Sequence, residues 1–97
     1  MKPKIEFSVR PHQNPETDHV DQYFDQDDKC WRAVYVDVVM FINGVSHMRD
    51  FCLNGSENIR TCKASILRSL RIRVANFPTH YQERGLEPEQ LLQVAYL

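Results

Sequence analysis

The sequence predicts an α+β fold: a small three-stranded antiparallel sheet with a packed amphipathic helix and a short C-terminal helix. Three patterns lead to this expectation. Residues 4–10 alternate polar and apolar side chains, residues 30–53 hold two strand-forming runs, and residues 56–76 repeat apolar side chains at helical spacing. The chain has 97 residues, 42% of them hydrophobic, which is typical of a single domain spanning residues 1–97.

The first strand is predicted over residues 4–10, where Ile5, Phe7 and Val9 share one side, and it ends at Pro11. Residues 11–28 are rich in polar and acidic side chains and contain two prolines. We expect them to form a long acidic loop, with room for one helical turn near Asp18–Phe24. Loops of this length in compact domains tend to be functional or disordered.

The strongest strand pattern is Cys30–Ile42, and because both of its faces are largely apolar we expect it to be the central strand. Asn43-Gly44 follows, and both residues tolerate the positive φ of a type I′ turn. Residues 30–53 should therefore form a β-hairpin.

The register of this hairpin carries a conflict. A two-residue turn would place Met40 opposite His47 and Asp37 opposite Asp50, and the second pair brings like charges together. Either Arg49 relieves the two carboxylates diagonally or the register contains a bulge.

The main helix is predicted over residues 56–76, with Asn54 or Ser56 capping its first N–H groups. It should end before Pro78, because the residue before a proline disfavours the helical conformation. A C-terminal helix over residues 87–97 should begin near Pro88. The apolar arc that packs on the sheet contains Ile59, Cys62, Ile66, Leu67, Leu70 and Val74.

Charge is segregated along the chain although the net charge is only −1. Residues 11–28 hold six acids and no Lys or Arg, whereas residues 56–75 hold five cations and one acid. Such opposed patches steer and orient macromolecular partners. The sequence therefore favours a binding protein.

The candidate partner-binding residues come from these two segments. In the acidic loop, aromatic anchors stand among carboxylates, a combination typical of docking segments. On the helix, arginines share one face and suit carboxylate or phosphate groups. A solvated loop and an ordinary solvated helix face remain the plain alternatives. The candidates are Tyr23, Phe24, Asp25, Asp27, Asp28, Arg60, Arg68 and Arg71.

No motif for catalysis, a metal or a cofactor accompanies these patches. The serine-nucleophile and phosphate-loop glycine patterns are missing, and the histidines and cysteines lack zinc-ligand spacing. We expect a non-enzyme without cofactors, with Cys30, Cys52 and Cys62 as free thiols in a reducing compartment. No apolar run reaches the roughly 18 residues of a membrane span, and the N-terminus lacks a signal-peptide core, which predicts a cytosolic chain.

Two X-Pro bonds form a further candidate site. Phe77-Pro78 and Glu87-Pro88 lie in segments that are expected to be exposed, where such bonds populate cis measurably. A host prolyl isomerase could therefore contact Phe77, Pro78 and Pro88. Simple helix punctuation by the prolines is the alternative.

In size and in its hairpin-plus-helix layout, the chain resembles the anti-RecBCD accessory proteins of lambdoid Salmonella phages. The likeness extends over the whole chain without a signature motif, and it includes the opening Met1-Lys2-Pro3-Lys4-Ile5-Glu6-Phe7. The resemblance implies a protein of the host cytoplasm that binds the host RecBCD helicase–nuclease. Such a protein would inhibit or modulate the enzyme, protect phage DNA ends and favour phage recombination. It implies no catalytic residue.

Two other classes stay open. A sheet with a packed helix is similar to double-stranded-RNA-binding domains, although 12 Lys and Arg against 13 acids fall short of the expected basic patch. Alternatively, the acidic loop could imitate DNA in an anti-restriction or anti-CRISPR protein. We expect no direct contact with nucleic acid and none with a membrane.

Overall fold

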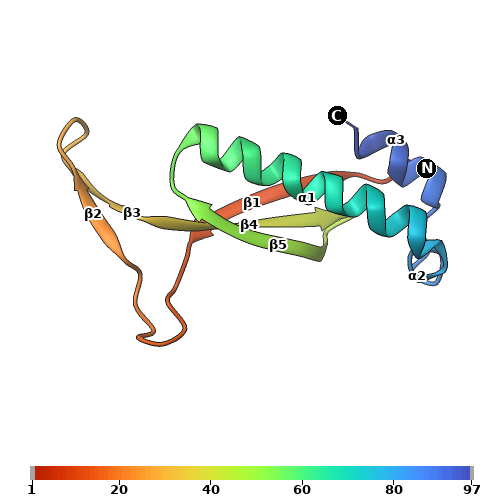
Figure 1. Ribbon diagram of the computed structural model, residues 1–97, viewed down its shortest axis with the longest axis horizontal. Coiled ribbons are helices and arrows are strands. Elements are labelled where there is room, and N and C mark those ends of the chain that lie inside the picture. The colour runs from red at the N-terminus through yellow and green to blue at the C-terminus, as the bar shows by residue number, and fades with distance from the viewer. Residues whose placement is uncertain (1, 97) are drawn as a thin grey trace.

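The computed structural model describes residues 2–96 and confirms the predicted α+β fold (Figure 1). A three-stranded antiparallel sheet packs against a long helix, and a short C-terminal helix completes the core. The elements in chain order are β1 (Ile5–Pro11), β2 (Gln22–Asp25), β3 (Cys30–Ala33), β4 (Tyr35–Ile42), β5 (Val45–Leu53), α1 (Ser56–Asn76), α2 (Pro78–Gln82) and α3 (Pro88–Val94).

Strand β4 lies between β1 and β5 and pairs antiparallel with both. Its side chains are buried on both sides: Val38, Met40 and Ile42 belong to the core, and Val39 is buried on the opposite face. The expectation of an apolar central strand is therefore confirmed for residues 35–42.

The beginning of that predicted strand is wrong, because the chain bends at Val34. The N–H of Val34 donates to the carbonyl of Asp21 at 2.8 Å, and its carbonyl accepts the N–H of Asn54 at 2.8 Å. Strand β5 ends at Leu53, opposite Tyr35, so it offers β3 no partner. Strand β3 pairs instead with β2 in a separate two-stranded sheet.

The expected long loop over residues 11–28 is also corrected. Residues 22–25 form strand β2 and residues 26–29 form the turn after it, and no helical turn forms near residues 18–24 in the described chain. The part before β2 closes a compact turn, in which Asn14 donates its N–H to His19 at 2.8 Å and accepts that of Asp18 at 2.7 Å. Tyr23 and Phe24 suit a strand, and residues 30–33 provide its partner.

The β4–β5 hairpin forms as predicted, with φ of 51° at Asn43 and 81° at Gly44. A bulge at His47 shifts the register, so that Met40 lies opposite Met48 rather than opposite His47. Asp37 consequently faces Phe51 instead of a second carboxylate. Of the two predicted alternatives, relief by Arg49 or a bulge in the register, the structure therefore contains the bulge.

Helix α1 has the predicted bounds and buries Cys62, Ile66, Leu70 and Val74. The predicted cap is wrong, because Gly55 occupies the N-cap position and no side chain caps the helix. The Asn54 amide instead donates to the Ala33 carbonyl at 3.0 Å, which ties the start of α1 to strand β3.

The C-terminal region adds a helix that the sequence did not predict. Residues 78–82 form α2, which begins at Pro78 and carries the buried Tyr81. Helix α3 follows and buries Leu91. Leu86 and Ala95 complete this end of the core.

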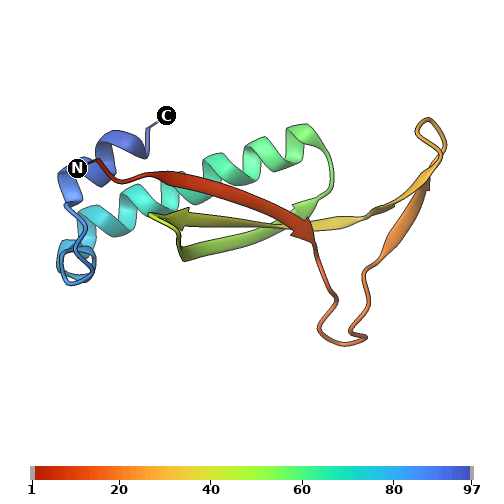
Figure 2. The ribbon, with the colours of Figure 1, turned by 180° about the vertical axis from the view of Figure 1, so that it is seen from behind.

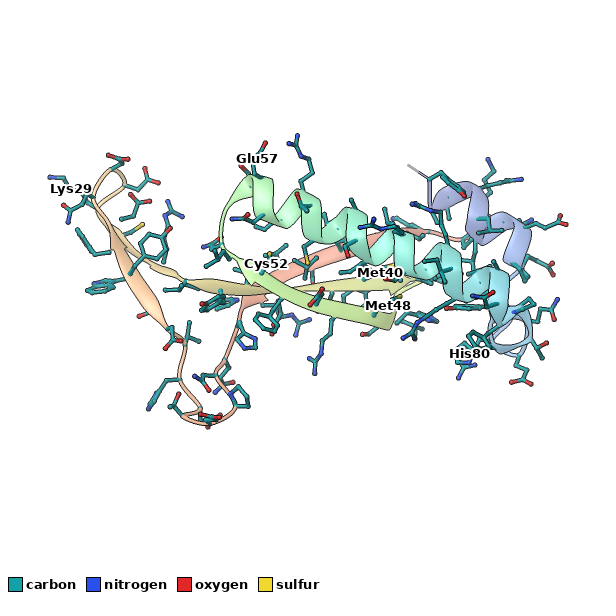
Figure 3. The ribbon with its side chains drawn as sticks, viewed as in Figure 1. Lys29, Met40, Met48, Cys52, Glu57 and His80 are labelled. Carbon is teal, nitrogen blue, oxygen red and sulfur yellow. The ribbon has the colours of Figure 1, made fainter. Side chains whose placement is uncertain are left out.

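The molecule is elongated, with extents of 47 × 28 × 20 Å. The β2–β3 hairpin projects at one end of the long axis, and α2 and α3 lie at the other end (Figures 1 and 2). Side chains line the whole length of the projecting hairpin (Figure 3). No helix in the described residues 2–96 is both long and apolar enough to cross a membrane.

Candidate protein-docking surface

Residues 22–33 form a projecting hairpin that we call the aromatic arm. Phe24 lies opposite Trp31, and their rings meet edge to face with centroids 5.5 Å apart and an interplanar angle of 68°. Trp31 is 65% exposed and Phe24 is 41% exposed. The pair is a preformed aromatic surface that does not belong to the core, and the strands β2 and β3 that carry it project from the main sheet (Figure 1).

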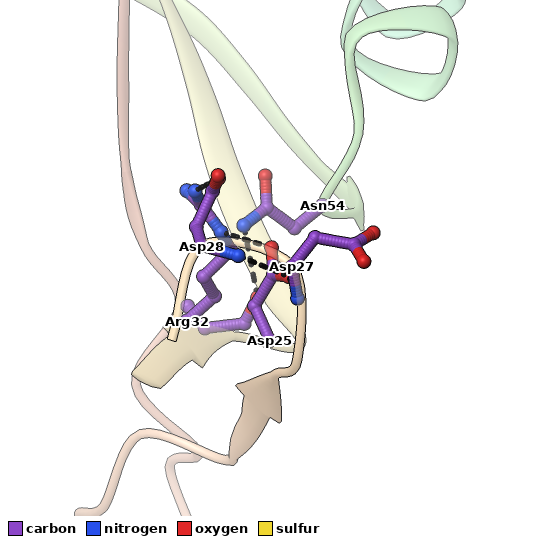
Figure 4. A network of polar contacts seen from close by, with 6 residues as sticks. Asp25, Asp27, Asp28, Arg32 and Asn54 are labelled. Atoms are coloured by element: carbon purple, nitrogen blue, oxygen red, sulfur yellow. Dashed lines mark hydrogen bonds and ion pairs between the residues drawn. The ribbon is translucent and has the colours of Figure 1, made fainter. Parts of the chain in front are cut away.

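The turn at the tip of the arm is built around Asp25. One carboxylate oxygen accepts the N–H groups of Asp27 and Asp28 at 2.9 and 3.2 Å, and the other accepts from Arg32 Nε at 2.7 Å (Figure 4). Arg32 also pairs with the Asp28 carboxylate. The backbone bond from Asp28, followed by Arg32, lowers the pKa of Asp25 below its usual value. These bonds therefore favour the ionised form of Asp25 and hold the turn together.

These contacts change the role of the predicted acids. Asp25 and Asp28 share the single guanidinium group of Arg32, so each has a cationic partner and the three groups together keep one negative charge. The Asp27 carboxylate has no cationic partner among the described residues, and the residue is exposed. Of the three predicted carboxylates, Asp27 is the one without a cationic partner in residues 2–96.

The predicted anchors Tyr23 and Phe24 are separated by the pleat of the strand. Phe24 pairs with Trp31, whereas Tyr23 pairs with Arg32 and so points to the other side of the arm. A single flat partner surface cannot cover both rings. The sequence did not indicate Trp31 as an anchor, because the pattern placed this residue in the central strand. The signal that pointed to it was a large aromatic side chain in a run that is apolar on both faces.

A second exposed surface lies on the side of the sheet opposite to α1, and we call it the open face. The rings of Tyr35 and Phe51 meet edge to face at 6.1 Å, and His12 stacks on Phe51 at 4.7 Å. His12 Nδ1 lies 2.7 Å from a carboxylate oxygen of Asp37. These contacts fix the aromatic rings over the end of the sheet where β4 begins and where β1 and β5 end.

A groove of about 590 Å³ runs beside these rings, and Arg10 and Arg49 line it together with Phe51. Strand β1 contributes Arg10 and strand β5 contributes Arg49, on either side of β4. Neither guanidinium group forms an ion pair with an acid between residues 2 and 96. Asp37 and Asp50 line the same groove, so the open face is aromatic and carries charges of both signs.

The predicted arginine face of α1 is divided by its contacts. Arg60 pairs with Glu57 at 2.6 Å. Arg71 donates to the Ala95 carbonyl at 2.8 Å and lies over the Tyr96 ring, 4.5 Å from its centroid. Arg71 thus holds the C-terminal segment against α1.

The third of the predicted helix arginines, Arg68, is exposed and forms no ion pair within residues 2–96. The sequence grouped Arg68 with Arg60 and Arg71 because the three share a helix face. The structure leaves Arg68 as the member of this group whose charge is uncompensated.

The prolines of the predicted isomerase site both begin helices, Pro78 in α2 and Pro88 in α3. No cis peptide bond occurs in the described residues. Phe77 is exposed beside Pro78. These positions agree with helix punctuation, and contact with a prolyl isomerase stays a prediction.

All three cysteines are free, and Cys62 is buried in the core. Burial raises the pKa of the Cys62 thiol to about 11, with a further contribution from Cys52. No group of three or more His, Cys, Asp or Glu side chains in residues 2–96 is arranged to hold a metal ion.

Comparisons with protein-family models, with curated proteins and with solved structures give no match to this chain. The chain is therefore described by its own geometry: a small α+β protein with an aromatic arm at one end and an aromatic open face with charges of both signs on its sheet.

Proposed function

We propose that this chain is a phage protein that binds the host RecBCD helicase–nuclease and inhibits or redirects it. Its action would protect phage DNA ends and favour phage recombination. The partner is taken from the resemblance described above. The mode of binding is taken from the aromatic arm, whose exposed Phe24–Trp31 pair is the observation that carries the proposal.

Aromatic side chains dominate the binding energy of protein interfaces, and tryptophan is the most enriched among them. A narrow hairpin also reaches between the subunits of a large complex, where a flat face cannot. The rings of Phe24 and Trp31 already contact each other, so little side-chain freedom is lost when a partner covers them. The arm is thus suited to anchor the protein on a larger assembly.

The exposed charges have a separate part in this proposal. Asp27 at the tip of the arm and Arg68 on α1 are exposed, and charges at the rim of an interface mainly set the association rate. Neutralising Asp27 should therefore change the association rate and its salt dependence. Truncating the aromatic rings should instead accelerate dissociation.

An affinity pull-down from a bacterial lysate, with and without nuclease treatment, tests the partner. Recovery of RecB, RecC and RecD under both conditions is the expected result. Recovery that disappears after nuclease treatment would point to bridging nucleic acid, and recovery of a different nuclease would replace RecBCD as the partner.

Binding kinetics on purified RecBCD then test the anchor. Phe24→Ala combined with Trp31→Ala should increase the dissociation rate by at least about tenfold, a loss typical of aromatic hot spots. The control is Ile72→Ala, which removes an exposed apolar side chain from α1. If the arm variant dissociates as slowly as the control, the aromatic pair does not anchor the complex.

A further inference from the structure

The aromatic arm lies outside the core of its own chain. It projects from the sheet (Figures 1 and 2), and its Phe24–Trp31 pair stays outside the core. An isolated two-stranded hairpin is marginally stable in water, and soluble monomers rarely leave contiguous apolar surface exposed. Covering this pair therefore stabilises both the arm and the molecule.

The open face of the same chain is complementary to the arm. It presents the edge-to-face rings of Tyr35 and Phe51 next to Arg49, whose guanidinium group forms no ion pair within residues 2–96. Asp37 in the same groove is already held by His12, at 2.7 Å. The arm presents its own ring pair and the Asp27 carboxylate, which has no cationic partner in those residues. Apolar surface can thus meet apolar surface while Asp27 meets Arg49.

We propose that the arm of one copy docks on the open face of a second copy, so that the free protein is a two-fold symmetric dimer with exchanged arms. Each chain carries both halves of the contact, and a two-fold axis then creates the contact twice. In each contact Asp27 lies by Arg49, and the Phe24–Trp31 pair covers Phe51.

The dimer does not depend on which enzyme is the partner in the cell. The proposed contact with RecBCD uses the same aromatic pair, so the two associations compete, and binding the enzyme requires the dimer to open. Until the protein binds RecBCD, the dimer contact also keeps the Phe24 and Trp31 rings covered.

The purified protein alone provides the first test. Trp31 is the only tryptophan in the chain and is largely exposed in the monomer. Sedimentation velocity should show a dimer that dissociates on dilution, and tryptophan emission should shift to the red over the same concentrations. A wild-type protein that is monomeric throughout would overturn the inference, and the lysate pull-down would still test RecBCD binding separately.

Charge reversal tests the geometry. Asp27→Lys and Arg49→Glu should each weaken self-association by at least about tenfold, because each places like charges in both contacts. A mixture of the two variants should dimerise again, since every contact then pairs opposite charges. The doubly substituted chain should dimerise for the same reason.

The matched control is Arg68→Glu on α1, which should leave the dimer unchanged because this residue lies outside the arm and the open face. Rescue in the mixture also shows that both variants are folded. If either single variant remains a wild-type dimer, or if mixing restores nothing, the exchanged-arm contact is wrong.

Discussion

Arg32 shows how one side chain can decide the character of a whole segment. The arm tip contains three aspartates, and two of them are held by this single guanidinium group. The same contacts raise the pKa of Arg32 above its ordinary value, mainly through the bond to Asp25. The arm tip is therefore a folded turn in which Asp27 is the aspartate without a cationic partner among the described residues.

Cys62 permits a test of burial at a single atom. Burial raises the pKa of its thiol from 9.0 to about 11, so the folded protein holds about a hundredfold less thiolate at about pH 8 than the unfolded chain does. We expect iodoacetamide to modify Cys62 in urea far faster than in buffer. Peptide mass spectrometry measures both rates, and equal rates would contradict the docking of α1.

The same thiol predicts how stability depends on pH. The unfolded chain loses the Cys62 proton near pH 9.0 and the folded chain only near 11, so between these values rising pH stabilises the unfolded state relative to the folded state. The free energy of unfolding should be highest below this window and decline as pH rises through it. Cys62→Ala should have a shallower decline in denaturant titrations, whereas an unchanged slope would assign the decline to other groups.

Among the elements, α1 determines most of the packing. Leu70 is fully buried at the centre of its apolar face, and Leu70→Ala should lower the free energy of unfolding by about 2–5 kcal/mol. Domains of this size hold about 5–15 kcal/mol in total, so the loss is readily measured by denaturant titration.

Ile72 provides the matched control on the same helix, because its side chain is 56% exposed. Ile72→Ala should change stability by less than about 0.5 kcal/mol, as is usual for surface positions. Similar losses for Leu70→Ala and Ile72→Ala would mean that α1 does not pack on the sheet through the predicted face.

Elements with a strong local signal were predictable from the sequence. The period of α1 and the Asn43-Gly44 turn fixed the helix and the hairpin because backbone chemistry and hydrophobic spacing act there over a few residues. The bulge at His47 was anticipated only as one of two ways to keep Asp37 away from Asp50.

The arm was not predictable because residues 30–33 pair with strand β2, whereas the rest of the predicted strand pairs with β1 and β5. Residues 30–33 continue the strand pattern of β4 without a break in composition, and the bend at Val34 follows from backbone bonds to Asp21 and Asn54. These partners are distant in sequence. The candidate site was therefore found in part: Phe24 and Asp27 were identified, whereas Trp31 was assigned to the sheet.

At the scale of the whole molecule, the aromatic arm and the C-terminal helices lie at opposite ends of a 47 Å long axis, and the sheet joins them (Figure 2). The acidic and basic side chains are only partly separated between these two ends of the molecule. Two acids of the arm share Arg32 as their cationic partner, and Arg71 holds the C-terminal segment. The uncompensated charges are thus scattered single groups rather than one continuous basic surface.

This distribution predicts weak binding to duplex DNA. Proteins that bind DNA through phosphates need several clustered cations and lose affinity steeply as salt rises, because bound counterions are released. Here the net charge is −1, Arg60 is paired with Glu57, and Arg71 is engaged with Ala95. We expect no duplex binding tighter than micromolar at about 0.15 M salt, measured by fluorescence anisotropy with a labelled duplex.

Sub-micromolar binding with a steep salt dependence would mean that the protein binds nucleic acid rather than docking on a protein. In that case Arg10→Glu combined with Arg49→Glu would show whether the groove on the open face holds the phosphates.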